Sequence, residues 1–300
     1  FDILDSGMPT VISGLLKGQE EPFLPADVLG LSELVRVDVV PLSEYSSPTR
    51  LRNATIIRPA ELSMPLHEAA RLLRQPASQR GMHAYMRHMP LARAPEVLKR
   101  LPLKRALHLA SANGARLMAA NLWLGDGGLR SSMHYDGHDN LLIQLSGEKH
   151  LLLVPPALSE GHGLYAPMHE RQYVYDPATH AFVGTAAAHV RGVAKPPAEN
   201  QATVDVFAPA AAAAAGPPAA PAPAPAVPAP AGPGQPVVGP EHADAPSEDS
   251  GKPLSEPLQS MARHALLCTV RPGETLFLPD LWSHAVASAS APTTPKKASG

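Results

Sequence analysis

The sequence of 300 residues contains a single cysteine, Cys268, so the chain cannot form an internal disulfide. A lone thiol is typical of proteins from a reducing compartment, because disulfides persist mainly in oxidising ones. Cys268 lies in the apolar run ALLCTV, where a buried and unreactive thiol is expected. We therefore expect a cytoplasmic or nuclear protein that does not use thiol chemistry.

Long apolar runs and an excess of charge of one sign are also missing. No apolar stretch approaches the roughly 18 residues that a helix needs to cross a bilayer. The 25 Lys and Arg residues nearly balance the 27 Asp and Glu residues, for a net charge of -2, so nothing points to nucleic acid or a membrane surface as a partner. The first residues carry no signal-peptide pattern. Because the chain begins with Phe rather than Met, this does not exclude a targeting signal.

Proline, in contrast, is abundant and unevenly placed. The chain has 35 prolines, far above the usual share of about 5%. Residues 187–260 are nearly all Ala, Pro, Gly and polar residues, with an Ala-Pro run at 208–232. Such a segment has little apolar area to bury, so we expect a disordered insertion, partly in polyproline conformation. Because the entropy of loop closure grows only with the logarithm of loop length, this insertion can lie within one domain.

The domain organisation follows from that insertion. Residues 1–186 are expected to supply the N-terminal part and the first portion of one domain, and residues 261–288 the second portion. Residues 289–300 are expected to be a disordered tail, because the chain loses its strand pattern from Ser288 onward.

Short alternating runs predict a mainly β chain with a few helices near the N-terminus. Leu34–Val40 alternates apolar and polar residues and predicts a half-buried strand. A helix is predicted from about Ser63 to Arg74, with Pro65 in its first turn, and another from Pro95 to Leu101.

Two strand–turn–strand patterns follow, each with a short glycine-containing turn. Such a pattern predicts a β-hairpin, in which the two strands pair with each other. The strands are Asn140–Leu145 with Lys149–Val154, and Leu266–Val270 with Thr275–Leu278.

The chemistry is concentrated around His134, Tyr135 and Asp136. Residues two apart in a strand face the same way, so His134 and Asp136 can reach one metal ion if the strand continues through them, with Tyr135 pointing away. His284 ends the second strand pair. A His-x-Asp pair with one remote His is the ligand set of a facial triad, which holds Fe(II) and leaves positions open. The alternatives are a chance His-x-Asp among 14 histidines and a core histidine at His284.

Two further side chains are candidates for holding an organic acid. Lys149 can meet a carboxylate as a compact charge, although a solvated lysine at a hairpin end is the simpler interpretation of its position. Ser131, three residues before the first ligand, can add a hydroxyl donor. Other histidines, such as His83 and His88, lie outside any ligand spacing and are expected at the surface or behind the ligands.

These motifs match a known family when they are taken together. They are Asn121–Gly125, Ser131–Asp136, Asn140–Leu141, Ser146–His150, Val154–Pro156, Leu164–Pro167, Ala265–Glu274 and Leu278 through Trp282 to His284. Over about residues 8–186 and 260–288 the chain resembles the Jumonji-C oxygenases, a cupin-like branch of the Fe(II)- and 2-oxoglutarate-dependent enzymes. Within them it looks most like the small lysyl hydroxylase group, which is also described as having peptidase activity. The resemblance implies a double-stranded β-helix, or jelly roll, with flanking N-terminal helices.

The resemblance also assigns roles to the site residues. It implies that His134, Asp136 and His284 bind iron, and that Lys149, helped by Ser131, binds the distal carboxylate of 2-oxoglutarate.

Two more positions come from the resemblance alone. Tyr85 matches a tyrosine whose hydroxyl reaches the same carboxylate, with a core aromatic as an equal alternative. Asn140 matches an asparagine beside the co-substrate, although an asparagine that opens a strand is equally a turn residue.

The activity implied is hydroxylation of a protein or peptide side chain, with lysine favoured, using O2 and 2-oxoglutarate at Fe(II). The alternatives are a catalytically silent jelly roll that binds a partner and a metal-dependent peptidase. The family continues after its last ligand with a further strand and with helices that often form a dimer, and neither has a counterpart after residue 288. We therefore expect an unpaired sheet edge and an open pocket wall, with Ser283 in place of a bulky aromatic residue.

Overall fold

The computed structural model describes most of the chain outside the Ala/Pro-rich region. The described residues are 6–16, 32–42, 50–52, 55–101, several between 103 and 111, 114–161, 164–187, 189–190, 193–194, 200–202, 206 and 263–289. The Ala-Pro run at 208–232 and the tail from residue 290, for which the sequence predicts disorder, lie outside them.

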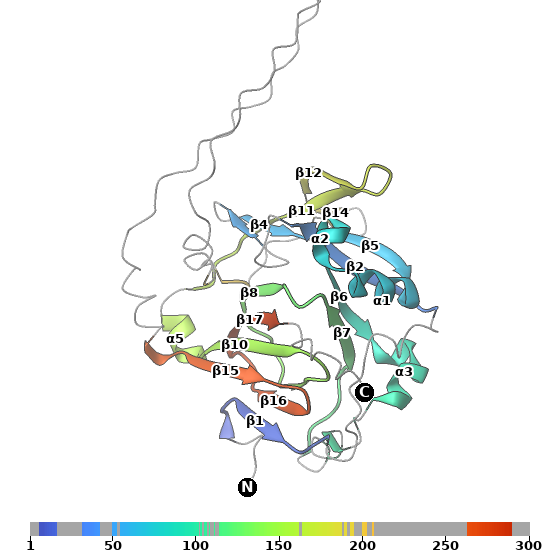
Figure 1. The fold of residues 1–300 in the computed structure, drawn as a ribbon. Coiled ribbons are helices and arrows are strands. Elements are labelled where there is room, and N and C mark those ends of the chain that lie inside the picture. Colours follow the sequence, from blue (N-terminus) through green and yellow to red (C-terminus); the bar gives the residue numbers. More distant parts are fainter. Residues whose placement is uncertain are drawn as a thin grey trace, which may run out of the picture.

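Two antiparallel sheets face each other and form the jelly roll (Figure 1). The four-stranded sheet has the order β15 (Leu266–Val270), β10 (Glu148–Val154), β17 (Ser283–Ala289), β8 (Arg130–His134). The three-stranded sheet has the order β1 (Thr10–Ser13), β16 (Glu274–Leu278), β9 (Asn140–Ile143). Apolar side chains from both sheets meet between them, and the cluster includes Leu151, Leu153, Val270, Leu276 and Leu278. The predicted fold class is confirmed.

Both predicted hairpins are wrong, because each turn carries the chain from one sheet to the other. β9 pairs with β16 and β10 pairs with β15 and β17, so consecutive strands are not partners. The two corners bond to each other instead: the Gln144 N–H donates to the Glu274 carbonyl at 3.0 Å, and the Gly273 N–H donates to the Gln144 carbonyl at 2.9 Å. Gly147 and Gly273 have φ of 67° and 89°, which glycine adopts without strain. A local glycine signal is the same for a hairpin and for such a corner.

The second ligand strand also differs from its prediction. His284 lies near the start of β17 rather than at the end of a strand pair, and β17 runs on through Ser288 to Ala289. It pairs with β10 along its whole length and with β8 on its other side. The prediction that strand structure ends before Ser288 was therefore wrong by two residues. Two partner strands order these small residues in spite of their weak strand propensity.

A second layer lies beside the jelly roll and carries the helices. Its sheet has the order β5 (Ala60–Pro65), β2 (Leu34–Pro41), β6 (Met82–Pro90), β7 (Asn121–Gly125). The helices are α1 (Leu66–Arg74), α2 (Ala77–Arg80), α3 (Pro95–Arg100) and the short 3-10 helix Leu91–Arg93. α1 buries Leu66, Ala69, Ala70 and Leu73 in one cluster with apolar residues of β2 and β6, as its helical spacing predicts. Pro65 is the residue before the helix, not part of its first turn.

The remaining described elements are a third sheet, a short strand pair and one more helix. A third sheet has the order β12 (Ala181–Ala187), β11 (His169–Asp176), β4 (Thr55–Arg58), β3 (Arg50–Arg52). The short pair β13 (His189–Val190) and β14 (Val193–Ala194) follows it, and α5 (Pro156–Gly161) follows β10. A partly buried ion pair of 2.6 Å between Arg58 and Glu170 joins β4 to β11. No helix in the described ranges is long and apolar enough to cross a membrane.

Candidate metal centre

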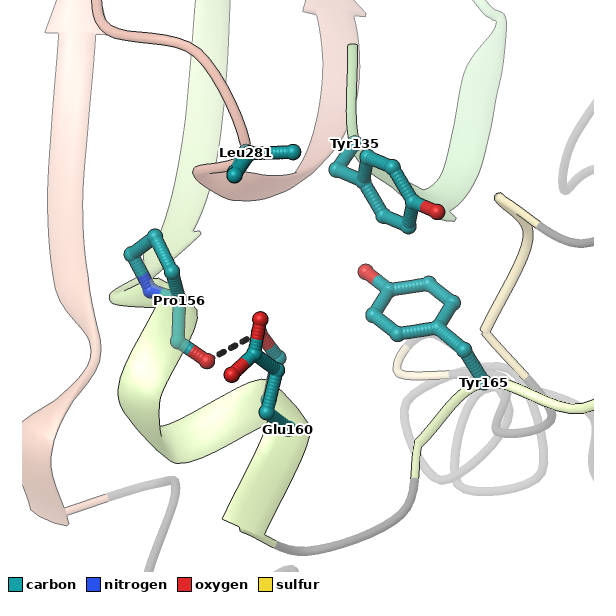
Figure 2. Close-up of a pocket in the computed structure, with 6 residues that line it drawn as sticks. Tyr135, Pro156, Glu160, Tyr165 and Leu281 are labelled. Carbon is teal, nitrogen blue, oxygen red and sulfur yellow. Dashed lines mark hydrogen bonds between the residues drawn. The ribbon is translucent and has the colours of Figure 1, made fainter. Parts of the chain in front are cut away.

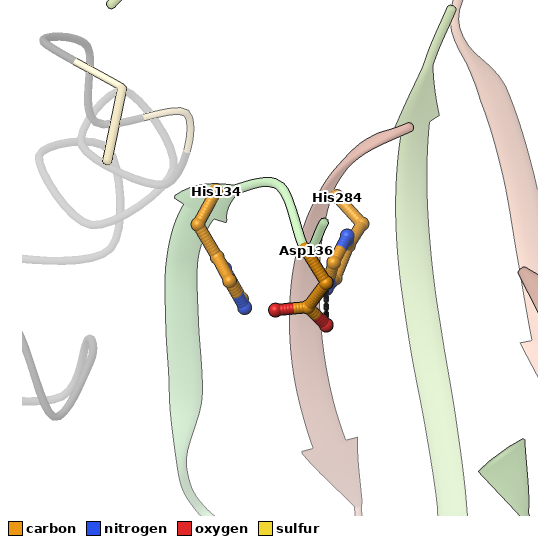
Figure 3. A group of neighbouring side chains, drawn as sticks. All are labelled: His134, Asp136 and His284. Atoms are coloured by element: carbon orange, nitrogen blue, oxygen red, sulfur yellow. Dashed lines mark ion pairs between the residues drawn. The ribbon is translucent and has the colours of Figure 1, made fainter. Parts of the chain in front are cut away.

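The three side chains predicted to bind metal converge at one end of the jelly roll. His134 is the last residue of β8, and the neighbouring strand β17 places His284 directly opposite it. Asp136 follows two residues later and turns toward both rings (Figure 3). One ligand atom from each of the three residues lies within 4.8 Å of the others. The metal-ligand cluster is therefore assembled from residues that are about 150 positions apart in the chain.

The sequence-based prediction assumed that one strand continues through His134, Tyr135 and Asp136. In the structure it does not. β8 ends at His134, and Asp136 lies in the following loop. Two remote segments hold this loop. The Tyr135 N–H donates to the Asn200 carbonyl at 3.3 Å, and the Leu281 N–H donates to the Asp136 carbonyl at 2.9 Å. These bonds replace the pairing that a continuing strand would have supplied.

Part of the predicted insertion contributes to this support. Within residues 187–260, where the sequence predicts disorder, the structure describes the strand pair β13 and β14, residues 200–202 and residues 187 and 206. Gln201 forms an isolated bridge with His134. The Ala202 N–H donates to the Met133 carbonyl at 2.9 Å, and the Ser132 hydroxyl donates to the Gln201 side-chain oxygen at 3.0 Å. The sequence shows no signal for this pairing, because the segment lies in a region of low-complexity composition.

Both imidazoles are oriented by backbone carbonyls. Nδ1 of His134 lies 2.8 Å from the Ser132 carbonyl oxygen, and Nδ1 of His284 lies 3.0 Å from the Trp282 carbonyl oxygen. A carbonyl oxygen only accepts hydrogen bonds, so each Nδ1 carries the proton and each Nε2 offers its lone pair. Such hydrogen bonds fix the tautomer and the ring direction of metal-binding histidines. Nε2 of His284 lies 3.9 Å from an oxygen of Asp136.

The electrostatics favour a neutral, ligand-competent ring at His284. His284 is only 6% exposed. Burial, together with the neighbouring His134, lowers the pKa of His284 to about 4. A neutral imidazole is the form that binds a metal ion. Two imidazoles and one carboxylate fit a divalent ion, and with this donor set Fe(II) in a facial triad is the characteristic occupant.

Lys149 faces the interior of the same sheet. Side chains two apart in a strand share a face, so Lys149 points the same way as Leu151 and Leu153, which lie between the two sheets. Its ammonium lies 5.9 Å from the centroid of the Trp123 ring and close enough to His284 to contribute to the low pKa of that histidine. Burial lowers the pKa of Lys149 to about 8. Among the described residues, no carboxylate forms an ion pair with it.

Ser131 reaches the metal-ligand face because of a bulge in β8. Ser131 is opposite Val286, and His134 is opposite His284, so two residues of β8 face a single residue of β17. Without the bulge, a residue three positions before His134 would point to the other face. The extra residue reverses the alternation, and Ser131 then shares the interior side with Val286, which packs against the interior cluster.

The arrangement of strands and ligands agrees with the comparison to known families. A family model described as a cupin-like domain matches residues 9–295, which is nearly the whole chain. The chain belongs to the cupin-like domain family. Two JmjC proteins are among its relatives, so the JmjC resemblance is confirmed.

These two relatives are similar to the cupin-like chain at low identity. Lysine-specific demethylase JMJ32 of Arabidopsis thaliana is 28% identical over 170 residues, which cover 56% of this chain and 36% of that protein. The human bifunctional peptidase and (3S)-lysyl hydroxylase JMJD7 is 27% identical over 244 residues, which cover 79% of this chain and 59% of that protein. The chain therefore spans only part of the length of each relative.

Tyr85 and Asn140 take different places in the cupin-like site. Tyr85 is 8% exposed, burial raises its pKa, and its ring centroid lies 5.9 Å from that of Trp123. It thus contacts the same indole as Lys149 and remains a neutral phenol. The amide of Asn140 donates to a carboxylate oxygen of Asp136 at 3.1 Å, so the contact that the structure shows is with a metal ligand.

Trp123 and His88 complete the surroundings of the site, and the sequence did not single out the first. The two ring centroids lie 4.2 Å apart. His88 has φ of 52° and lies where β6 bulges against β7. Burial lowers its pKa, and the charges of Asp136 and His134 also act on it. A bulge can redirect a side chain toward a functional site. The prediction that His88 is not a ligand but lies at the surface or behind the ligands is consistent with this position.

Proposed function

We propose that this cupin-like protein is an Fe(II)- and 2-oxoglutarate-dependent dioxygenase that hydroxylates a protein side chain, with lysine as the favoured residue. The observation that carries the proposal is the combination of two features. One imidazole nitrogen from each of His134 and His284 and a carboxylate oxygen of Asp136 lie within 4.8 Å of one another, and the partly buried Lys149 lies on the same interior face. A metal cupin that acts without an organic acid has no need of the lysine.

Each side chain then has a defined task. His134, Asp136 and His284 would hold iron(II) by Nε2, carboxylate and Nε2. Iron(II) and 2-oxoglutarate together would supply the activation of O2 for insertion of oxygen into a C–H bond. Lys149 would neutralise the distal carboxylate of 2-oxoglutarate, and Ser131 would donate a hydrogen bond from the same face.

The substrate proposal depends on the relatives. One is named a lysine-specific demethylase and the other a (3S)-lysyl hydroxylase, so both names refer to lysine. The cupin-like chain shares about a quarter of its residues with each over the matched length. We therefore propose lysine in a protein or peptide as the first substrate to test.

The test is release of succinate from 2-oxoglutarate by the purified protein with Fe(II) and lysine-containing peptides. We expect His134→Ala to abolish turnover. The matched control is His150→Ala, since His150 lies on β10 with about half of its side chain exposed and outside the ligand cluster. Lys149→Ala should raise the KM for 2-oxoglutarate much more than it lowers kcat. Absence of succinate from folded, iron-loaded protein would contradict the proposal.

A catalytically silent binding module is the second candidate, and sheet topology favours it. Among the described strands, β7 and β9 each end their sheets, so each has one edge without a partner. An open edge exposes backbone donors and acceptors that another chain can pair with. Peptide binding without succinate release would support this module. Peptide cleavage that requires metal but not 2-oxoglutarate would support the peptidase alternative, in line with the name of the human relative.

A further inference from the structure

A pocket of about 310 Å³ lies beside the metal-ligand cluster, and none of its lining residues is a metal ligand. Tyr135, which separates His134 from Asp136 in the sequence, forms one wall. The pocket is lined by Tyr135, Pro156, Ser159, Glu160, Tyr165 and Leu281 (Figure 2). The proposed oxygenase chemistry gives none of these residues a role.

Two tyrosine rings form the aromatic side of this pocket. The rings of Tyr135 and Tyr165 meet edge to face, with centroids 4.9 Å apart and planes at 89°. The Tyr165 hydroxyl donates to the Ser283 hydroxyl oxygen at 2.6 Å, which fixes the ring. Burial raises the pKa of Tyr165 to about 12, so the phenol is neutral. The faces of neutral phenol rings carry partial negative charge and attract cations.

The opposite side of the pocket carries an acid. Glu160 lies in α5, and its carboxylate points toward the same space as the Tyr165 ring, with Pro156 and Leu281 at the border (Figure 2). Among the described residues, no cation forms an ion pair with Glu160. The lining contains no Lys, Arg or His side chain. Glu160 is exposed to solvent. Its carboxylate would repel an anion and attract a cation that enters the pocket.

The walls are held in place before any ligand arrives. The Ser159 hydroxyl donates to the Pro156 carbonyl at 2.9 Å and fixes the first turn of α5. Leu281 adopts φ of 59°, a conformation that costs a leucine free energy, while its N–H bonds to Asp136. Strained residues of this kind persist where surrounding structure holds them, and they are concentrated at functional sites.

We propose that this pocket binds the cationic side chain, an ammonium or a guanidinium, of a lysine or arginine in a polypeptide partner. The carboxylate of Glu160 would pair with the charge, and Tyr135 and Tyr165 would contact it through their ring faces. Pro156 and Leu281 would cover the alkyl part of the side chain. A volume near the lower end of the range for ligand pockets suits one side chain rather than a whole peptide.

The experiment measures binding of the blocked peptide acetyl-Gly-Gly-Lys-Gly-Gly-amide by NMR of the tyrosine rings in chelator-containing buffer. The signals of Tyr135 and Tyr165 are assigned with the two Tyr→Phe variants. We expect the lysine peptide to shift both signals and a norleucine peptide of the same length to shift neither. Glu160→Gln should weaken binding at least fivefold. Glu68→Gln is the matched control, since Glu68 is an exposed carboxylate on α1, and should change binding less than twofold.

A second variant separates this pocket from the metal-ligand cluster. Asp136→Asn should retain binding of the lysine peptide if the cation enters the tyrosine pocket, and loss of binding would overturn the proposal. Equal binding of the norleucine peptide, or no effect of Glu160→Gln, would also overturn it. Because metal and 2-oxoglutarate are absent from this experiment, its result does not depend on the succinate assay. A protein that releases no succinate is still expected to bind the lysine peptide.

Discussion

Replacing Lys149 with methionine should stabilise the protein in the absence of ligand. The fold keeps this ammonium partly buried on the interior face, and no described carboxylate pairs with it. Burial lowers the pKa of Lys149 from 10.5 to about 8. Each tenfold change in proton affinity corresponds to about 1.4 kcal/mol, so the charged side chain costs the native state up to roughly 3 kcal/mol at pH 7. Methionine has a similar length and no charge, which removes this cost.

The pH dependence gives the sign of the effect. Below pH 8 both the native and unfolded states hold the proton, and the full cost is present. Between about pH 8 and 10.5 the unfolded state binds more protons, so the stability of the wild type should rise with pH relative to Lys149→Met. The two proteins should approach each other in stability above that window. Urea unfolding at pH 7, 9 and 10.5 measures the difference directly.

Ligand should largely offset this difference in stability at pH 7. Together with a divalent metal, 2-oxoglutarate at a hundred times its Kd should stabilise the wild type by about 2.7 kcal/mol and should have little effect on Lys149→Met. Lys99→Met, at an exposed lysine of α3, is the control and should change the free energy of unfolding by less than about 0.5 kcal/mol. The reasoning fails if Lys149→Met is less stable than the wild type at pH 7, or if their difference does not vary with pH.

Two further substitutions test the support of the site by unfolding measurements. Gly125→Ala would place a Cβ 2.9 Å from the Tyr85 ring, and this overpacking should cost about 1–3 kcal/mol, whereas Gly137→Ala meets no atom within 4 Å and should be nearly neutral. Asp126→Ala would leave the guanidinium of Arg80 buried without its 2.6 Å partner and should cost about 3–5 kcal/mol. Burial alone would raise the pKa of Asp126, but its hydrogen bonds lower it below 3.8, so this contribution should be present above pH 4 and lost as the pH falls further. A Gly125→Ala protein as stable as Gly137→Ala, or an Asp126→Ala protein within 1 kcal/mol of the wild type, would contradict these assignments.

Local patterns in the sequence were sufficient for several strands and for the chemistry of the ligands, but not for β5 or for the pair β13 and β14. The alternation at Leu34–Val40 and the helical spacing after Leu66 correspond to β2 and α1. The types and order of the candidate ligands were visible because few residue types bind iron. Trp123 was not singled out, since an aromatic residue in a strand is usually part of the core, and only its contact with Lys149 marks it as a wall of the site.

Pairing between segments far apart in the chain could not be predicted from the sequence. The two predicted hairpins were wrong for this reason. Glycine turns at Gly147 and Gly273 have the same local sequence whether the chain reverses within a sheet or crosses to the facing one. The crossing is favoured here because β10 and β16 each gain two strand partners, which a simple hairpin would not provide. The support from residues 200–202 was hidden for a related reason, since three residues that bond to β8 and to the loop after it leave no periodic signal.

The site therefore depends more on register than on residue identity. His134 lies opposite His284 because β17 is held by seven residue pairs with β10 and by the bulged pairing with β8. A slip of one residue in β17 would turn His284 to the outer face and place a serine or alanine toward Asp136. Lys149 shares that register through its pairing with Ser288, so the same slip would separate the ligands from the cation. The small residues of β17 specify this register only weakly. The hydrogen bonds at Gln144 and the buried ring of Trp282 therefore help to hold the register.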